Sequence, residues 1–194
     1  MGNIMTCKIN ADTSDGLKIV SDTSGVVEIQ ANGTKSNNIS FTGRIVQTVN
    51  TQTGAVATGT TTMPQDDTIP QNTEGDEYMT LAITPSNASN KLKIDVVWHG
   101  SSSNTGSNIM VAALFQDSTA NALAAGSGGT HDAANDMQHI YFTHFMAAGT
   151  TSETTFKVRV GFNASGTTTF NGAAGSRRLG GVFASSITIQ EIEV

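Results

Sequence analysis

Residues Lys91–His99, KLKIDVVWH, decide the fold class of this 194-residue chain. Every second position is apolar in this stretch: Leu92, Ile94, Val96 and Trp98. The residues between them are mostly polar or charged. A period of two places these two sets on opposite faces of a β-strand, with one face buried and the other in contact with water. The stretch therefore predicts a half-buried strand of an antiparallel sheet.

Further strand-like segments surround this stretch at the spacing of a β-sandwich. They are Arg44–Asn50, Ala55–Thr62, Tyr78–Thr84, Asn108–Asp117, His139–Gly149, Thr154–Asn163, a short strand around Phe170, and Ile187–Val194. Turns rich in Gly, Asn and Ser separate them, and no segment has a convincing helical pattern. We therefore predict an all-β antiparallel β-sandwich of the jelly-roll type.

Two of these segments carry additional predictions. Asn108–Asp117 is apolar on both faces, which is typical of a central core strand or of a strand at a subunit interface. After it we expect a hairpin with its turn near Ser118–Asn121, and we interpret Gly126–Gly129 as a flexible turn.

The first forty residues differ from the rest of the chain. Asp12–Val20 and Asp22–Gln30 form a near-repeat, in which an Asp-Thr-Ser turn leads into a short strand. A unit of about ten residues is too small to bury an apolar face by itself. We predict an N-terminal attachment and assembly segment, residues 1–40, before a jelly-roll domain, residues 41–194. Cys7 is interpreted as a small apolar residue of an N-terminal strand.

Charge and composition exclude several partners. The formal net charge is -6, with only 10 Lys and Arg residues, so a basic surface for nucleic acid is not expected. No apolar run approaches the roughly 20 residues of a membrane-spanning helix. Neither membrane nor nucleic acid is therefore a predicted partner, and no cofactor is expected.

Histidine and aspartate residues gather between positions 131 and 144, where a metal site is one candidate interpretation. The candidate ligands are His131, Asp132, Asp136 and His139. Their spacing fits no known ligand module, so solvated loop residues or hydrogen bonds between subunits are favoured. His144 shares a strand face with Phe142 and Met146, which favours a core or interface histidine.

A second cluster is acidic, and it is the nearest thing to a catalytic site in the sequence. Its members are Asp66, Asp67, Glu74, Asp76 and Glu77. These carboxylates could hold calcium or form the paired carboxylates of a glycosidase. Their spacing is not that of a calcium loop, and the chain has only 1 Trp and 2 Tyr with which to stack sugar rings. A solvated loop is favoured, and we predict no catalytic residue and no enzyme activity.

The C-terminal stretch Ser176–Val194, SRRLGGVFASSITIQEIEV, ends on a predicted strand. We expect that strand to pair with Arg44–Asn50, with a bulge near Gln190-Glu191 where the apolar pattern changes phase. Ile192 and Val194 are expected to be buried by the core or by a partner subunit. Arg177 and Arg178 are candidate subunit-interface residues that could pair with Glu191 or Glu193.

Segment order gives a resemblance to a known class of proteins. Asp66–Ser103, Val111–Gly126 and Arg177–Val194 resemble the β-sandwich module in small structural proteins of tailed, marine-type bacteriophages. The resemblance spans about residues 44–194. It implies a non-enzymatic virion protein, made in the host cytoplasm, that binds the capsid surface as a decoration, cement or head-fibre protein. Its implied partners are copies of itself in a homotrimer and the major capsid protein.

The same resemblance implies an alternative function. The chain could be a tail-fibre or receptor-binding tip that recognises a host surface glycan. The candidate contacts are then Trp98 and His99 with the loops at 101–108 and 126–136. Asn104 and Asn108 are the named residues of the first loop.

Overall fold

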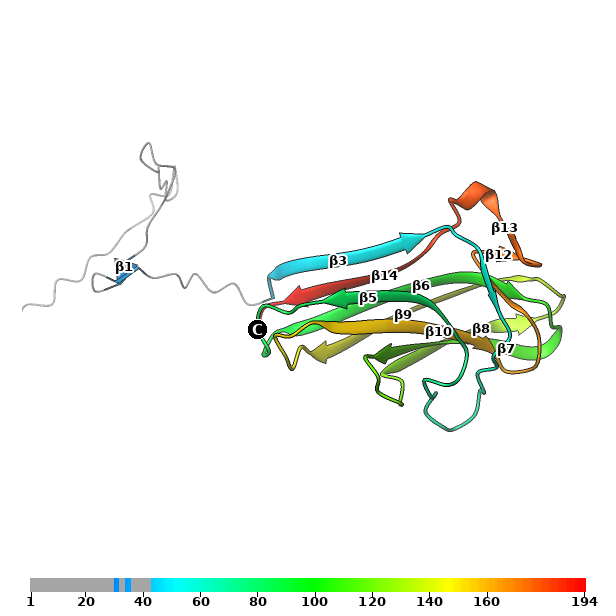
Figure 1. The fold of residues 1–194 in the computed structure, drawn as a ribbon, viewed down its shortest axis with the longest axis horizontal. Helices are drawn as coiled ribbons and strands as arrows, with labels where there is room; N and C mark the ends of the chain where they lie inside the picture. The colour runs from blue at the N-terminus through cyan, green and yellow to red at the C-terminus, as the bar shows by residue number, and fades with distance from the viewer. Residues whose placement is uncertain (1–29, 32–33, 36–42) are drawn as a thin grey trace, which may run out of the picture. The chain divides into compact units, whose positions relative to one another are not determined.

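Strand β6 (Lys91–Ser102) runs through the larger of two stacked sheets in a computed structural model of the chain (Figure 1). The structure describes residues 30–31, 34–35 and 43–194. The chain divides into two units, Met1–Ser40 and Phe41–Val194. In the first unit only β1 (Gln30–Ala31) and its antiparallel partner β2 (Thr34–Lys35) are described. Cys7 and the two near-repeats lie outside the described residues, except for Gln30, the last residue of the second near-repeat.

The larger sheet of the second unit has six strands, all of them antiparallel to their neighbours. Strands β14 and β11 pair with one edge of β6, and β9 pairs with the other edge. Beyond them, β3 pairs with β14 and β4 pairs with β11. The bounds are β3 (Ile45–Thr53), β4 (Ala57–Gly59), β9 (Met137–Ala147), β11 (Thr168–Phe170) and β14 (Ser185–Ile192).

The smaller sheet has four antiparallel strands in the order β5-β10-β7-β8. Their bounds are β5 (Asp76–Ile83), β7 (Gly106–Gln116), β8 (Ala124–His131) and β10 (Thr154–Phe162). A separate ribbon of β12 (Gly172–Ala173) and β13 (Ser176–Arg177) precedes a one-turn 3-10 helix, Leu179–Gly181. The fold is an all-β antiparallel sandwich of the jelly-roll type, as the sequence predicts. No α-helix occurs in residues 43–194, and no described helix is long and apolar enough to cross a membrane.

The core lies between the two sheets and is built from the alternating residues that predicted it. Leu92, Ile94, Val96 and Trp98 of β6 are at most 1% exposed. They face the inner side chains of β10, which are Phe156, Val158, Val160 and Phe162. Burying a large apolar side chain stabilises the fold by about 1.5–3 kcal/mol. This double layer of side chains therefore supplies most of the stability of the sandwich.

Strand β7 is buried on both faces within one chain. Met110, Ala112 and Leu114 join the main core, whereas Val111, Ala113 and Phe115 pack with Met63 in a second, smaller cluster. Met63 belongs to residues 61–75, which we call the cover segment. Its backbone N–H donates to the carbonyl oxygen of Phe162 at 3.1 Å. Of the two sequence interpretations, the core strand is confirmed, because the chain's own loop covers the second face.

The predicted turn at Gly126–Gly129 is wrong, since these residues lie inside β8. The glycines are there because β9 approaches closely. A Cβ added to Gly126 would lie 2.9 Å from Cδ1 of Phe142, and one on Gly128 would lie 2.8 Å from Oε1 of Gln138. Glycine in a strand often marks such an approach rather than a turn. The hairpin turn expected near Ser118–Asn121 is confirmed, because it joins β7 to β8.

The C-terminal strand lies inside the larger sheet, between β3 and β6. It pairs with β3 in antiparallel register, and this register shifts between Glu191 and Ile192, so the predicted neighbour and the predicted bulge are both confirmed. The predicted burial within the chain is wrong. Ile192 is only partly buried, and Val194 is 53% exposed. The inward position near this end of the strand is occupied by Glu191, which is 0% exposed.

Candidate functional site

The outer face of β6 and β9 carries an exposed group of aromatic and histidine side chains. Odd-numbered residues of β9 point outward, because Ile140 occupies the core face and side chains alternate along a strand. His99 lies directly opposite His139 in the β6–β9 register. Their Nδ1 atoms are 2.8 Å apart, so one ring donates a hydrogen bond to the other. Further along β9, Tyr141 is 61% exposed and Phe145 is 56% exposed.

Aromatic contacts hold the two imidazole rings in place. The ring of Phe183 stacks on His99 with a centroid distance of 4.7 Å and an interplanar angle of 26°. The edge of Tyr141 meets the same imidazole at 5.7 Å, and Phe183 meets His139 at 5.7 Å. Partial burial lowers the pKa of His99, and the charge of the neighbouring His139 lowers it further. The neutral form of His99 is therefore favoured near pH 7.

Two of the charged residues on this face, Lys93 and Asp95, neutralise each other. Nζ of Lys93 lies 2.7 Å from Oδ2 of Asp95, whose Oδ1 accepts a hydrogen bond from Thr143 at 2.6 Å. Burial raises the pKa of Asp95, but the hydrogen bonds from Lys93 and Thr143 and the charge of Lys93 outweigh burial and lower it. Lys91, which is exposed beside Phe145, is the remaining charge. The face therefore has no unpaired carboxylate, although the whole chain carries -6.

An apolar cleft of about 290 Å³ adjoins the histidine pair, and Phe183 belongs to both. The cleft is lined by Asn135, Met137, Ala173, Arg178, Leu179 and Phe183. Beside it, Leu179 is 72% exposed and Val182 is 86% exposed. The exposed apolar surface thus extends from β9 to the turn around the 3-10 helix. Sequence analysis missed this extension, because Leu179, Val182 and Phe183 show no strand period that would place them on a face.

The four candidate metal ligands do not converge. His139 belongs to the aromatic group, whereas Oδ2 of Asp136 accepts the backbone N–H of Ala133 at 2.8 Å within its own loop. Asp132 is exposed, and His131 is the last residue of β8. Within the residues that the structure describes, no group of three or more His, Cys, Asp or Glu side chains could hold a metal ion. His144 is partly buried on the inner side of β9.

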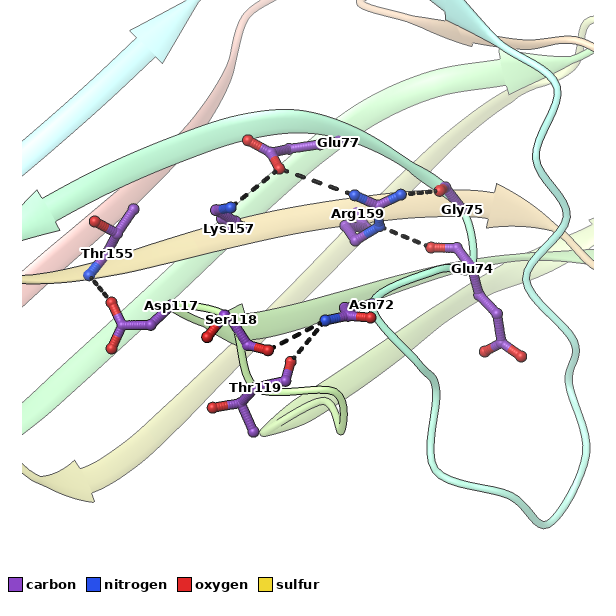
Figure 2. A network of polar contacts seen from close by, with 10 residues as sticks. All are labelled: Asn72, Glu74, Gly75, Glu77, Asp117, Ser118, Thr119, Thr155, Lys157 and Arg159. Carbon is purple, nitrogen blue, oxygen red and sulfur yellow. Dashed lines mark hydrogen bonds and ion pairs between the residues drawn. The ribbon is translucent and has the colours of Figure 1, made fainter.

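The acidic cluster does not form a single site, because its members bond to separate neighbours. Figure 2 shows two of them, Glu74 and Glu77, near Lys157 and Arg159 of β10. Glu77 lies 3.8 Å from Lys157 and 3.9 Å from Arg159. The Arg159 guanidinium also donates to the carbonyl oxygens of Glu74 and Gly75, at 2.9 and 2.7 Å. These bonds fasten the end of the cover segment to β10.

The other acids bond to different neighbours. The Glu74 side chain accepts the N–H of Gln71, Asp76 accepts from Thr61, and Asp66 accepts from Thr68. The hydroxyl and the N–H of Thr68 lower the pKa of the Asp66 carboxyl. Asp67 is exposed. No pair among these carboxylates is arranged as a catalytic acid and base.

Two shallow clefts lie beside this segment, one lined by Asp66–Pro70 and Ala122–Ala125, the other by Pro64 and Ser127 among others. Small and apolar side chains provide most of both linings. Asp66 and Asp67 are their charged groups, so neither cleft brings together the groups that catalysis requires.

The predicted receptor-contact residues fall in different environments. Trp98 is 0% exposed, because it is on the inner face of β6, where its ring lies 6.5 Å from Tyr78 and 6.3 Å from Phe170. It therefore cannot be a surface contact. The side chain of Asn104 bonds to the Ser165 carbonyl, and that of Asn108 to the Thr105 carbonyl at 3.0 Å. Only His99 of the four belongs to the exposed aromatic group.

The predicted interface arginines have a different arrangement from the one expected. Arg177 and Arg178 are exposed, and Arg178 lines the apolar cleft. Glu193 pairs with Arg44 at 2.9 Å instead.

Glu191 has neutral partners only. Its carboxylate accepts hydrogen bonds from Ser86 (N–H and hydroxyl), Asn87, Asn90 and Gln47. Burial raises the pKa of Glu191, but these hydrogen bonds outweigh burial and lower the pKa to about 2. Sequence analysis missed this buried carboxylate, because all of its partners are more than 100 residues away along the chain.

Comparison with solved structures finds chains of partial similarity. The chain is similar to Eiger, a TNF protein of S. frugiperda, with 8% identity and a TM-score of 0.43, covering 78% of this chain and 96% of that chain. It is also similar to VP2 of the infectious bursal disease virus subviral particle, with 11% identity and a TM-score of 0.30, covering 86% of this chain and 43% of that one. No curated protein matches the chain.

A family model described as the Reeler domain matches residues 8–120, which is more than half of the chain. Reeler domains are β-sandwiches typical of extracellular or secreted eukaryotic proteins, and they are typically non-catalytic. The predicted bacteriophage relationship is therefore wrong, as are the capsid-decoration and tail-fibre functions and the location on a virion. By this match, the chain belongs to the Reeler domain family.

Proposed function

We propose that this chain is a non-catalytic β-sandwich module that self-associates, as a homotrimer, through the outer face of β6 and β9. The observation that carries the proposal is the exposure of two large aromatic side chains on that face, Tyr141 at 61% and Phe145 at 56%. Large apolar groups are normally buried, and contiguous exposed patches mark interaction surfaces. Tyr141 also combines an apolar ring with a polar tip, which suits an interface.

A second copy of the chain is the favoured occupant because of charge. Two chains that each carry -6 repel one another, and this repulsion is least at a surface that lacks unpaired carboxylates. On the outer face of β6 and β9 the one carboxylate, Asp95, is already paired with Lys93. Alongside, the outward Ser, Thr and Gln side chains of β14 add uncharged surface. A closed ring of copies, three in this proposal, satisfies the face of every copy without leaving an open end.

Two observations support the proposal that the chain is not catalytic: the typical character of its family, and the partners of its acidic and histidine side chains. Family members are typically non-catalytic. The acids of the cover segment bond to their own neighbours, and His99 bonds to His139 rather than to a nucleophile. The potential acids and bases therefore have no common target atom.

The test is the mass of the purified full chain in solution, measured by sedimentation equilibrium. A homotrimer has three times the 20.1 kDa mass of one chain. The double variant Tyr141→Ser, Phe145→Ser should lower the association constant for trimer formation by about 100-fold or more. The matched control is Ile69→Ser, which removes an apolar side chain of similar exposure, 55%, from the cover segment.

The control should leave the association unchanged. A wild-type chain that stays monomeric at all accessible concentrations would disprove self-association. A mass of two chains would disprove the homotrimer. Equal effects of the double variant and the control would disprove the location of the interface.

A further inference from the structure

The histidine pair has a geometry that self-association does not explain. We propose that His99 and His139 together chelate one divalent transition-metal ion, binding Cu²⁺ most tightly and Ni²⁺ next. Both ligands come from a single chain, so this site does not require the proposed homotrimer. The two rings would supply two adjacent coordination positions, and water would complete the shell.

The separation of the two nitrogen atoms is set by their hydrogen bond in the metal-free chain, and it lies close to the spacing of two right-angled metal ligands. Metal–nitrogen bonds to imidazole are about 2.0–2.1 Å long. Two such bonds at 90° place the nitrogens about 2.9 Å apart, whereas a tetrahedral angle places them about 3.3–3.4 Å apart. The observed Nδ1–Nδ1 distance is 2.8 Å. Right-angled positions belong to the square-planar and tetragonal sites of Cu²⁺ and Ni²⁺, and Cu²⁺ is the tightest binder of the series.

The backbone and the surrounding rings preorganise this pair. His99 and His139 are direct cross-strand partners, so the β6–β9 ladder fixes the separation of their Cα atoms. Phe183 stacks on one face of the His99 ring, and Tyr141 lies parallel to His139 at 10° with a centroid distance of 6.4 Å. Binding an ion requires each ring to turn out of the hydrogen bond so that both lone pairs point at the metal, but the strands and the flanking rings limit the side-chain freedom that is lost, which favours affinity.

Chemistry at the site distinguishes among ions. The hydrogen bond between the rings requires a proton on one Nδ1, and chelation requires that proton on Nε2, leaving both Nδ1 lone pairs for the metal. Neutral imidazole suits copper, nickel and zinc, whereas calcium and magnesium require oxygen ligands. Asp95, the carboxylate on this face, is already bonded to Lys93 and Thr143. Hard cations are therefore not expected to bind.

The first experiment is titration of the metal-free full chain with Cu²⁺, followed by calorimetry and by electron paramagnetic resonance. We expect one ion per chain, with two nitrogen ligands in the spectrum. The variants H99N and H139N should each weaken Cu²⁺ binding by about 100-fold, because a chelate becomes a single-ligand site. Circular dichroism should confirm that both variants are folded.

The matched control is H144N, which removes another imidazole of β9 from the opposite, inner face of the strand. Its affinity for Cu²⁺ should equal that of the wild type, and Ca²⁺ should give no binding. Retention of wild-type Cu²⁺ affinity in H139N would overturn the proposal, as would a spectrum with one nitrogen or equal losses in H139N and H144N.

A further variant separates this site from the proposed interface. Phe145→Ser should weaken self-association while keeping the wild-type affinity for Cu²⁺. A monomeric wild-type chain that binds Cu²⁺ through both histidines would support the metal site and disprove the homotrimer. A trimer that does not bind Cu²⁺ would support the homotrimer and disprove the metal site.

Discussion

The two sheets of the sandwich present different outer faces. Over the smaller sheet, the cover segment inserts Met63 against β7, and Arg159 fastens the end of that segment to β10 (Figure 2). Over β6 and β9 of the larger sheet no described segment plays that part, and Tyr141 and Phe145 remain exposed. Apolar residues on the outer face of a sheet are therefore buried in one part of the molecule and exposed in the other. The difference is whether another segment of the chain covers them.

The largest effect is expected beneath the cover segment. Phe115→Ala should destabilise the chain by about 3–5 kcal/mol, because it leaves a cavity between β7 and Met63. The measurement is urea unfolding followed by circular dichroism. Phe145→Ala is the matched control on the outer face of β9. It should lower the free energy of unfolding by less than about 0.5 kcal/mol at concentrations where the chain is monomeric. Equal costs would remove the distinction between the two faces.

The larger sheet, whose outer face is not covered, should be stabilised on its inner side by the buried carboxylate of Glu191. Its folded pKa of about 2 lies below the ordinary 4.5, so the unfolded chain takes up the proton first as pH falls. The stabilisation, about 3 kcal/mol, is complete above pH 4.5 and is lost as pH falls toward 2.

In Glu191→Gln this acid-dependent loss should disappear, and stability at pH 7 should fall by about 2–3 kcal/mol. The measurement is urea unfolding at a series of pH values. Glu193→Gln is the control. Because its pair with Arg44 is at the surface, it should cost less than about 1 kcal/mol. An unchanged acid profile in Glu191→Gln would show that the carboxylate does not anchor the sheet.

A smaller effect is expected where the cover segment is fastened. Arg159→Met keeps the apolar stem but removes the bonds to the Glu74 and Gly75 carbonyls, at a cost of about 1–2 kcal/mol. Limited proteolysis should then cleave the cover segment faster than in the wild type. Lys157→Met, which loses only a 3.8 Å ion pair, should leave the cleavage rate unchanged. Protection of the segment in Arg159→Met would mean that Met63 alone holds it.

The smallest effect on folding is expected at Tyr141. Tyr141→Ser should change the free energy of unfolding of the monomer by less than about 0.5 kcal/mol, because an exposed side chain gains little from folding. Thermal unfolding at low chain concentration measures this. A large loss would show that the aromatic group stabilises the monomer itself, and the contrast between the two faces would weaken.

The sequence predicts the fold well because strand period is a local signal. Alternation in Lys91–His99 is sufficient to place Trp98 inward, and the pairing of the last strand with Arg44–Asn50 follows from jelly-roll topology. The same rule failed at Gly126–Gly129, where glycines permit a close approach by β9 that no local pattern reveals. The alternation rule also predicted the wrong buried residues at the end of β14, because Glu191 is buried there with hydrogen-bond donors from Ser86 and Asn90.

The functional prediction failed for a related reason. Strand order and low charge, which supported the bacteriophage resemblance, are shared by many β-sandwiches and do not define a family. At the candidate site the sequence named His99 and His139 separately, in a receptor loop and in a metal cluster. Only the β6–β9 register brings them together. Neighbours across strands forty residues apart cannot be read from spacing along the chain.

The position of β14 has a consequence for how the protein is made. Strand β3 leaves the ribosome early, but its neighbour in the sheet is β14, more than 130 residues later. Until β14 has been synthesised, β3 has no partner in the sheet, and β6 is unpaired along Lys91–Val97 of one edge. Long-range pairing of this kind slows folding and exposes unpaired edges to other nascent chains. The larger sheet should therefore be completed only after β14 has been synthesised, later than the hairpin of β7 and β8.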